Sequence, residues 1–256
     1  MVWFHEPACI HPHFWLTAPM GILRAISIST SETGLTAPLT EGFRLQIDAL
    51  ESWLLRIAVV PDDGLEVDRT WMIAPNDDAP WEGRDRLSTD GFACPPTIRQ
   101  VDGFENDKLA VRVEKDPLRI SISMRDGDVW KPLLDDRVNG AWQWFDQGNT
   151  LKHFQRLNPG EAHYGLGDKT GPLDRTGRRL RCLQSDALGY NAETSDPLYK
   201  HVPFVIVDGP NGACGLLYDT MAETTFDLGA EHSNYFERFR HVEMQERGTV
   251  VYVIAG

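Results

Sequence analysis

Apolar and polar residues alternate with a period of two along much of the chain. Phe43, Leu45 and Ile47, for example, are separated by polar residues. The stretches that share this pattern are 43–49, 55–59, 109–113 and 118–124. A period of two places successive side chains on opposite faces of a strand, so each stretch is predicted to be a half-buried β-strand. Further strands are expected at 224–228, 235–239 and 249–254.

The same pattern predicts an all-β protein. No stretch has the spacing of an amphipathic helix of three turns, and turn signals occur at Asp126-Gly127 and at 208–212. Two packed antiparallel sheets are the usual way to bury many one-sided strands, although periodicity alone does not separate a sandwich from a jelly roll or a barrel. Trp142 and Trp144 share one side of a strand, and we expect them to pack in the core rather than present a sugar-stacking surface.

Nothing in the chain marks an internal domain boundary or a repeat, so residues 1–256 are expected to form one domain. The polar stretch 76–97 has no period and is predicted to be a long surface loop or insertion. Residues 163–204 form a longer irregular segment: a short strand at 164–167, a turn-rich and arginine-rich part, and a new strand from Pro203. Ordinary connections have only about 4–6 residues, so a segment of this length is typical of a functional loop. Its turn containing Lys169 and Asp174 is expected to be held by internal polar contacts.

Several motifs in and after this segment resemble one protein family. They read YGLGDKTGPLDRTGRRLR (164–181), SDALGY (185–190), ETSDPLYK (193–200), PF (203–204), GLLYDTMAETTFDLG (215–229) and VVYVIAG (250–256). This order and spacing is similar to the N-terminal domain of family 31 glycoside hydrolases, the α-glucosidase and α-xylosidase group. The agreement extends from Leu118 to the C-terminus, with conservative departures at Asp168, where the family commonly has Glu, and at Ser185, where it has Thr.

The resemblance implies a large antiparallel β-sandwich of the galactose mutarotase-like supersandwich type. It also implies the N-terminal, substrate-cleft-forming and carbohydrate-binding domain of a retaining α-glycosidase, an enzyme that hydrolyses O-glycosyl bonds with two carboxylates. In the family the catalytic (β/α)8 barrel begins just after the position of Gly256, so its catalytic aspartates have no counterpart here. We therefore expect no catalytic residue in this chain and no hydrolysis by it alone. The expected partners are an α-linked oligosaccharide or α-glycoside and the catalytic barrel domain.

Asp186 and Tyr190 are the predicted substrate-binding residues. A carboxylate on a loop can accept hydrogen bonds from adjacent sugar hydroxyls, and by resemblance Asp186 matches an aspartate near the mouth of the barrel. The alternative is that Asp186 or Ser185 only caps a turn. Tyr190, and less so Tyr199, could offer a ring face to the C–H face of a sugar, whereas aromatic residues of β proteins are more often buried in the core.

Two other functions stay open from the sequence. The chain could be a stand-alone carbohydrate-binding or scaffold sandwich, which would have to cover or polarise the face that a barrel would otherwise contact. An aldose epimerase needs an acid/base pair, and the chain supplies residue types for one without a spacing that joins them. Those residues are His201, His232 and His241, with Glu231 or Glu243.

The charge of the chain disfavours some partners. Its formal net charge of −13 repels nucleic acid and anionic membranes. A local basic patch runs against this trend, and we expect it to be a solvated hairpin or a contact between domains rather than a nucleic-acid site. It consists of Arg175, Arg178, Arg179 and Arg181.

No cofactor or metal is expected from the sequence. Cys94, Cys182 and Cys214 have no CxxC spacing, which fits neither a zinc ribbon nor a disulfide framework and favours a cytoplasmic location. A tight N-terminal cluster contains zinc-ligand types but is more often incidental: His5, Cys9, His11 and His13. Polar residues interrupt every apolar run of the first thirty residues, so neither a signal peptide nor a transmembrane helix is expected. A homo-oligomer is possible.

Overall fold

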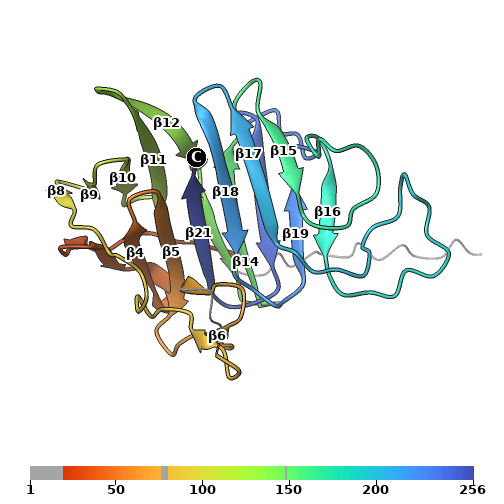
Figure 1. Ribbon diagram of the computed structural model, residues 1–256, viewed down its shortest axis with the longest axis horizontal. Coiled ribbons are helices and arrows are strands. Elements are labelled where there is room, and N and C mark those ends of the chain that lie inside the picture. Colours follow the sequence, from red (N-terminus) through yellow and green to blue (C-terminus); the bar gives the residue numbers. More distant parts are fainter. Residues whose placement is uncertain (1–19, 76–79, 148) are drawn as a thin grey trace, which may run out of the picture.

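The computed structural model describes residues 20–75, 80–147 and 149–256, and the N-terminal histidine and cysteine cluster lies outside these ranges. Strands dominate the described residues, with a single short 3-10 helix, Thr40–Gly42. No helix in this part of the chain is long and apolar enough to cross a membrane. The prediction of an all-β fold is confirmed (Figure 1).

The largest sheet has eight strands, and every neighbouring pair is antiparallel. In spatial order its strands are β15 (Ala162–Gly165), β17 (Phe204–Gly209), β18 (Gly212–Tyr218), β21 (Thr249–Ala255), β5 (Leu54–Pro61), β4 (Phe43–Glu51), β3 (Gly34–Pro38) and β2 (Ser29–Thr30). The turn predicted at 208–212 joins β17 to β18. This sheet forms one full layer of the molecule.

Two further sheets supply the opposite side of the core. The six-stranded sheet is β1 (Met20–Ile22), β13 (Trp142–Phe145), β14 (Thr150–Arg156), β20 (Phe239–Met244), β19 (Thr224–Asp227) and β16 (Arg179–Cys182). The five-stranded sheet is β12 (Val129–Asp135), β11 (Arg119–Asp126), β10 (Leu109–Glu114), β9 (Gly103–Glu105) and β8 (Ile98–Gln100). An isolated bridge between Asp136 and Gln155 links these two sheets.

One hydrophobic core is shared by all three sheets. Leu45 of β4, Val111 of β10 and Trp142 of β13 belong to the same cluster of buried side chains. On β10 the alternation places Leu109, Val111 and Val113 inside and the intervening residues toward solvent, as the period of two predicts. Trp142 and Trp144 are buried, which confirms that they pack in the core. The molecule is therefore an antiparallel sandwich, as expected.

A network of hydrogen bonds between buried polar side chains crosses this core. Asp136 accepts hydrogen bonds from the main-chain N–H of Ile120 (2.9 Å) and from Nε1 of Trp142 (2.8 Å). Nε2 of His153 lies 2.8 Å from the Asp136 carboxylate, and Nδ1 of His153 lies 2.9 Å from the Tyr218 hydroxyl. Ile120 is on β11, Trp142 and His153 are on β13 and β14, and Tyr218 is on β18. This hydrogen-bond network thus connects all three sheets.

The outer face of the eight-stranded sheet is covered where β4, β5 and β21 lie. Every residue of β5 is buried because one face meets the main core and the other meets a second apolar cluster that includes Leu87 and Phe92. Arg56 of β5 is fully buried and donates to the carbonyl oxygens of Arg86, Leu87 and Ser88. The described part of the polar stretch, residues 80–97, is irregular apart from the two-residue strand β7, and it seals a sheet face instead of only lying on the surface. A two-stranded sheet joins this cover, pairing β6 (Arg69–Thr70) with β7 (Arg84–Asp85).

One predicted strand is wrong. Residues 235–238 are irregular, and β20 begins at Phe239. The aromatic side chains that suggested a strand lie outside the sheet: Tyr235 is 91% exposed, and the Phe236 ring lies under the Arg137 guanidinium at 4.7 Å. High strand propensity therefore did not decide the backbone here, because neither ring packs into a sheet face.

Replacing Asp136 by Ala should lower the free energy of unfolding by about 3–5 kcal/mol, because three buried donors would lose their acceptor together. Chemical denaturation followed by tryptophan fluorescence measures this loss. Glu114→Ala is the matched control: it removes an exposed ion pair to Arg119 and should change stability by no more than about 1 kcal/mol. Equal effects of the two substitutions would show that the hydrogen-bond network does not hold the sheets together.

Candidate functional site

The long segment between β16 and β17 projects from one end of the sandwich. In Figure 1 it forms the large loop at the far right, beyond β16 and away from the five-stranded sheet. Residues 183–203 contain neither a helix nor a strand. The short strand predicted at 164–167 is present two residues earlier as β15, and the strand predicted from Pro203 begins at Phe204. The sequence therefore located both ends of the 163–204 segment closely, but it missed β16, which divides the segment into two loops.

Arg175 stabilises the turn between β15 and β16, which precedes this loop, by hydrogen bonds to its carbonyl groups. Its guanidinium donates to the carbonyl oxygens of Thr170 (3.0 Å) and Lys169 (3.3 Å), and the side chain is buried. Arg178 also donates to the carbonyl oxygen of Thr170. Two arginines of the predicted basic patch, Arg175 and Arg178, thus satisfy the carbonyl groups of an irregular turn that has no strand partner, while the Arg179 side chain remains 53% exposed.

Lys169 connects this turn to the outer loop. Its ammonium group is fully buried, donates to the carbonyl oxygen of Arg181 and lies 3.2 Å from the Asp196 carboxylate. The same carboxylate accepts the main-chain N–H of Arg181 at 2.6 Å. Thr170 adds a hydrogen bond to the carbonyl oxygen of Ser195 at 2.8 Å. Internal polar contacts therefore fix the base of the loop, as the sequence predicted for Lys169.

His163 and Asp174 complete the anchor at β15. The Asp174 carboxylate accepts the main-chain N–H groups of His163 (3.2 Å) and Thr176 (2.9 Å), and the Thr176 hydroxyl lies 2.9 Å from Nδ1 of His163. Hydrogen bonds from Thr176 lower the pKa of Asp174. Burial, with the nearby positive charge of Arg240, lowers the pKa of His163 to about 3. His163 is therefore neutral at neutral pH.

The tip of the loop brings together Asp186, Tyr190 and Tyr199. Hydrogen bonding to the Asp186 carboxylate and the negative charge of that group raise the pKa of Tyr199, so the two side chains lie close together. Tyr190 lies close enough to contribute to that shift. Asp186 is exposed, Tyr190 is 57% exposed and Tyr199 is 52% exposed. Neither tyrosine is a core residue, so both ring faces are available to a ligand.

This arrangement has the parts of a carbohydrate contact. One carboxylate keeps lone pairs free for sugar hydroxyls, and two half-exposed rings can cover the C–H face of a pyranose. The sequence pointed to Asp186 and Tyr190 and ranked Tyr199 lower. The structure adds that Tyr199 orients the carboxylate, a contact that no local motif predicts because it depends on how the loop folds back.

The histidines suggested for an epimerase do not form one site. Nε2 of His201 binds the carbonyl oxygen of Thr220 at 2.8 Å, and His232 lies in an exposed turn. Only His241 approaches a carboxylate of the proposed set, with Nδ1 3.9 Å from Glu231, while Glu243 pairs with Lys152 at 2.7 Å. Asp227, Glu231 and His241 form the one cluster within the described ranges whose ligand atoms could hold a metal ion.

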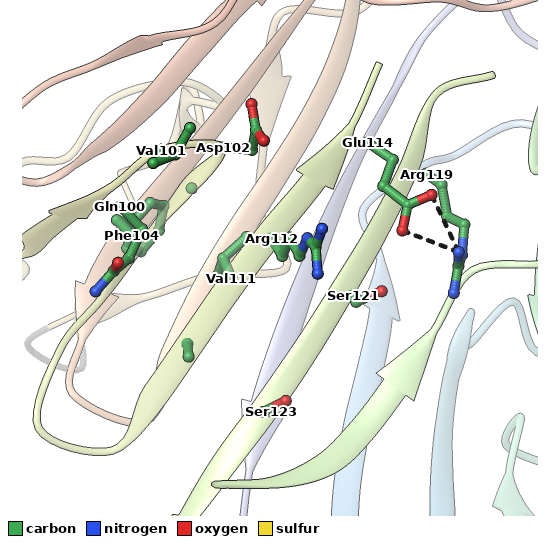
Figure 2. A pocket seen from close by; sticks show the side chains of 12 residues that line it. Gln100, Val101, Asp102, Phe104, Val111, Arg112, Glu114, Arg119, Ser121 and Ser123 are labelled. Atoms are coloured by element: carbon green, nitrogen blue, oxygen red, sulfur yellow. Dashed lines mark hydrogen bonds and ion pairs between the residues drawn. The ribbon is translucent and has the colours of Figure 1, made fainter. Parts of the chain in front are cut away.

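A hollow that the sequence did not indicate lies on the five-stranded sheet. It has a volume of about 520 Å³ and is lined by outward-facing residues of β10 and β11, including Arg112, Ser121 and Ser123. Figure 2 shows the ion pair between Glu114 and Arg119 at its edge. The hollow lies at the opposite end of the molecule from the loop (Figure 1) and has no exposed aromatic ring among its lining residues.

Fold and loop together define a mutarotase-like sandwich that carries an anchored loop with an exposed carboxylate and aromatic rings. Residues 44–227 match the family described as "Glycosyl hydrolase 31 N-terminal galactose mutarotase-like domain". The chain belongs to this family, and the resemblance seen in its motifs is confirmed.

Two curated relatives are α-glucosidases. Alpha-glucosidase 2 of Bacillus thermoamyloliquefaciens is 29% identical over 128 residues, which cover 50% of this chain and 16% of the relative. Alpha-glucosidase of Saccharolobus solfataricus is 33% identical over 85 residues, or 33% of this chain and 12% of the relative. The matched region is thus a small part of each relative and corresponds to a non-catalytic N-terminal domain.

Solved structures share the fold. A Flavobacterium johnsoniae dextranase of the same glycoside hydrolase family, determined with isomaltotriose, superposes with a TM-score of 0.70 at 19% identity, covering 92% of this chain and 26% of the dextranase. The α-1,4-glucan lyase of Gracilariopsis lemaneiformis gives a TM-score of 0.70 at 15% identity, covering 91% of this chain and 28% of the lyase. These likenesses confirm the supersandwich architecture.

Replacing Asp186 by Asn should return the pKa of Tyr199 toward its ordinary value, because the neutral amide no longer disfavours the phenolate. A pH titration of the Tyr199 ring signals by NMR measures the change. Tyr252 is the internal control: burial is the main cause that raises its pKa to about 12, and it should not respond. An unchanged Tyr199 titration in the variant would show that the two side chains do not meet in solution.

His163 should make stability depend on pH. Its pKa is about 3 in the folded chain and about 6.5 when unfolded, so the unfolded chain binds a proton that the folded chain excludes. The contribution is fully present above about pH 6.5 and is lost as pH falls toward 3, by about 1.4 kcal/mol per pH unit. Urea unfolding at several pH values should give a flatter slope for His163→Gln. Parallel slopes would contradict the assignment.

Proposed function

We propose that this chain is the part of an α-glucosidase-type glycoside hydrolase that forms one wall of the substrate cleft, with Asp186 and Tyr190 contacting an α-linked sugar. The observation that carries the proposal is the exposed group of Asp186, Tyr190 and Tyr199 on an anchored loop within a family 31 N-terminal domain. The relatives named above act on or bind α-glucosides, which supports this substrate class.

In this proposal the chain binds and orients but does not cleave. Retaining glycosidases need two carboxylates placed on either side of the scissile bond. At the loop tip Asp186 has an aromatic partner, whereas the carboxylates of Asp174 and Asp196 accept main-chain N–H groups and hold the backbone. A catalytic barrel domain supplies the nucleophile and the acid/base group.

Exposed apolar side chains support the packing of such a partner domain against this end of the sandwich. They occur in the loop region and in the neighbouring strand and turn: Leu173, Leu188, Val202, Ile206 and Met221. Apolar groups of this size gathered around a functional loop are typical of an interaction surface. A stand-alone sugar-binding module, the second function that the sequence left open, would be expected to carry polar residues at these positions.

The sugar contact can be tested with the 256-residue chain and maltose as the probe. Titration followed by NMR should shift the ring signals of Tyr190 and Tyr199, and Asp186→Ala should weaken binding about tenfold, the scale of one hydrogen bond to a charged group. Asp126→Ala is the matched control, since this exposed carboxylate lies in the β11–β12 turn and pairs with Lys131. Absence of any shift in the two tyrosines, or equal affinity for Asp186→Ala, would contradict the proposal.

The non-catalytic part has its own test. The chain alone should release no p-nitrophenol from p-nitrophenyl α-glucoside, even at high protein concentration. Turnover that persists through repurification would show that the chain carries its own catalytic groups.

A further inference from the structure

Three neighbouring strands of the six-stranded sheet place an arginine, an aspartate and a histidine side by side. Arg179 of β16 is the register partner of Asp227 on β19, and Asp227 is in turn the register partner of His241 on β20. Side chains directly opposite each other across antiparallel strands lie on the same face of the sheet. The row is at the end of the molecule where β16 and β19 run together in Figure 1, and it lies outside the Asp186 loop.

Glu231 reaches this row through a tight turn. Oδ1 of Asp227 accepts the main-chain N–H groups of Gly229 (3.0 Å), Ala230 (2.8 Å) and Glu231 (3.1 Å), so the chain after β19 curls around the aspartate. This turn returns the Glu231 carboxylate to within 3.9 Å of Nδ1 of His241. One ligand atom each from Asp227, Glu231 and His241 lie within 4.8 Å of one another.

His241 has a nitrogen that nothing in the described ranges satisfies. Its side chain is almost completely buried, and Nδ1 has no hydrogen-bond partner there. The ring stacks against Phe154 with 4.8 Å between centroids, which fixes the direction of Nδ1 toward the two carboxylates. An imidazole nitrogen is a common ligand of divalent metal ions. Buried polar atoms are normally paired, so this orphan nitrogen points to a missing ligand.

The Arg179 guanidinium places a positive charge next to the carboxylates of Asp227 and Glu231. Its Nε lies 3.0 Å from Asp227 and its terminal nitrogen 3.2 Å from Glu231. The arginine side chain is 53% exposed and Glu231 is 48% exposed, so both can move into solvent without disturbing the core. The guanidinium does not satisfy His241, because its hydrogen bonds go to the two carboxylates and none joins it to Nδ1 of the ring.

We propose that Asp227, Glu231 and His241 bind a divalent transition-metal ion of the zinc type, which displaces the Arg179 side chain. One imidazole with two carboxylates is a donor set that suits zinc, with ligand distances of about 2.0–2.2 Å and a fourth position left to water. The ligand atoms, which now lie within 4.8 Å of one another, would have to move closer together to reach these bond lengths. Zinc would satisfy the orphan nitrogen and neutralise both carboxylates at once, which the arginine cannot do. This site is independent of the function proposed above.

The test measures binding of Zn²⁺ to the full 256-residue chain by isothermal titration calorimetry, with Co²⁺ absorption as a readout of coordination. Both use a background in which His5, His11 and His13 are replaced by Ala, since these residues could bind zinc themselves. One equivalent of metal should bind. Arg179→Gln should tighten binding about tenfold by removing the competing cation, and Glu231→Gln should weaken it by a similar or larger factor.

Glu223→Gln is the matched control, because this carboxylate, just before β19, pairs with Arg181 of β16 but lies outside the cluster. It should leave zinc affinity unchanged. Glu231 is partly exposed, so its substitution should preserve the fold, which circular dichroism checks. Failure of the Arg179→Gln chain to bind zinc at millimolar concentration, or equal affinity of the Glu231→Gln chain and its parent, would overturn the proposal.

Discussion

One buried carboxylate sets the relative positions of the three sheets. Asp136 accepts from β11 and β13 and pairs with His153 on β14, which passes the contact to Tyr218 on β18. A carboxylate in an apolar core is tolerated only when its partners are in place, so the sheets cannot slide past each other without leaving a charge unpaired. The loop between β16 and β17 leads directly into β17, which pairs with β18 in the same sheet. The loop therefore projects from a fixed base.

Periodicity predicted the strands that have one face in the core and one in water, such as β10. It failed where polar side chains are buried. In β20, Arg240 and His241 lie inside among Glu161, Gln155 and Phe154, so the alternation of apolar and polar residues is lost and the strand was placed too early. The cover over β5 was equally hidden, because the burial of Arg86 depends on carbonyl groups and carboxylates far away in the chain.

The motifs of the sequence predicted Asp186 and Tyr190 as substrate-binding residues, and the structure places both side chains exposed at the tip of the loop. The contact between Asp186 and Tyr199 could not be predicted from the sequence, because it depends on an irregular backbone that Arg175 and Lys169 stabilise. The row formed by Arg179, Asp227 and His241 was missed for a related reason. Strand register joins these residues, and no single stretch of sequence records register.

Different residues of the loop fix its backbone and face the solvent. Arg175, Lys169 and Asp196 maintain the shape of the backbone, while the residues at the tip face solvent and contribute little to folding. Tip side chains can therefore drift in evolution without the loop collapsing. A scaffold of this kind can acquire preference for a new leaving group through a few exchanges at its rim, and its stability would be nearly unaffected.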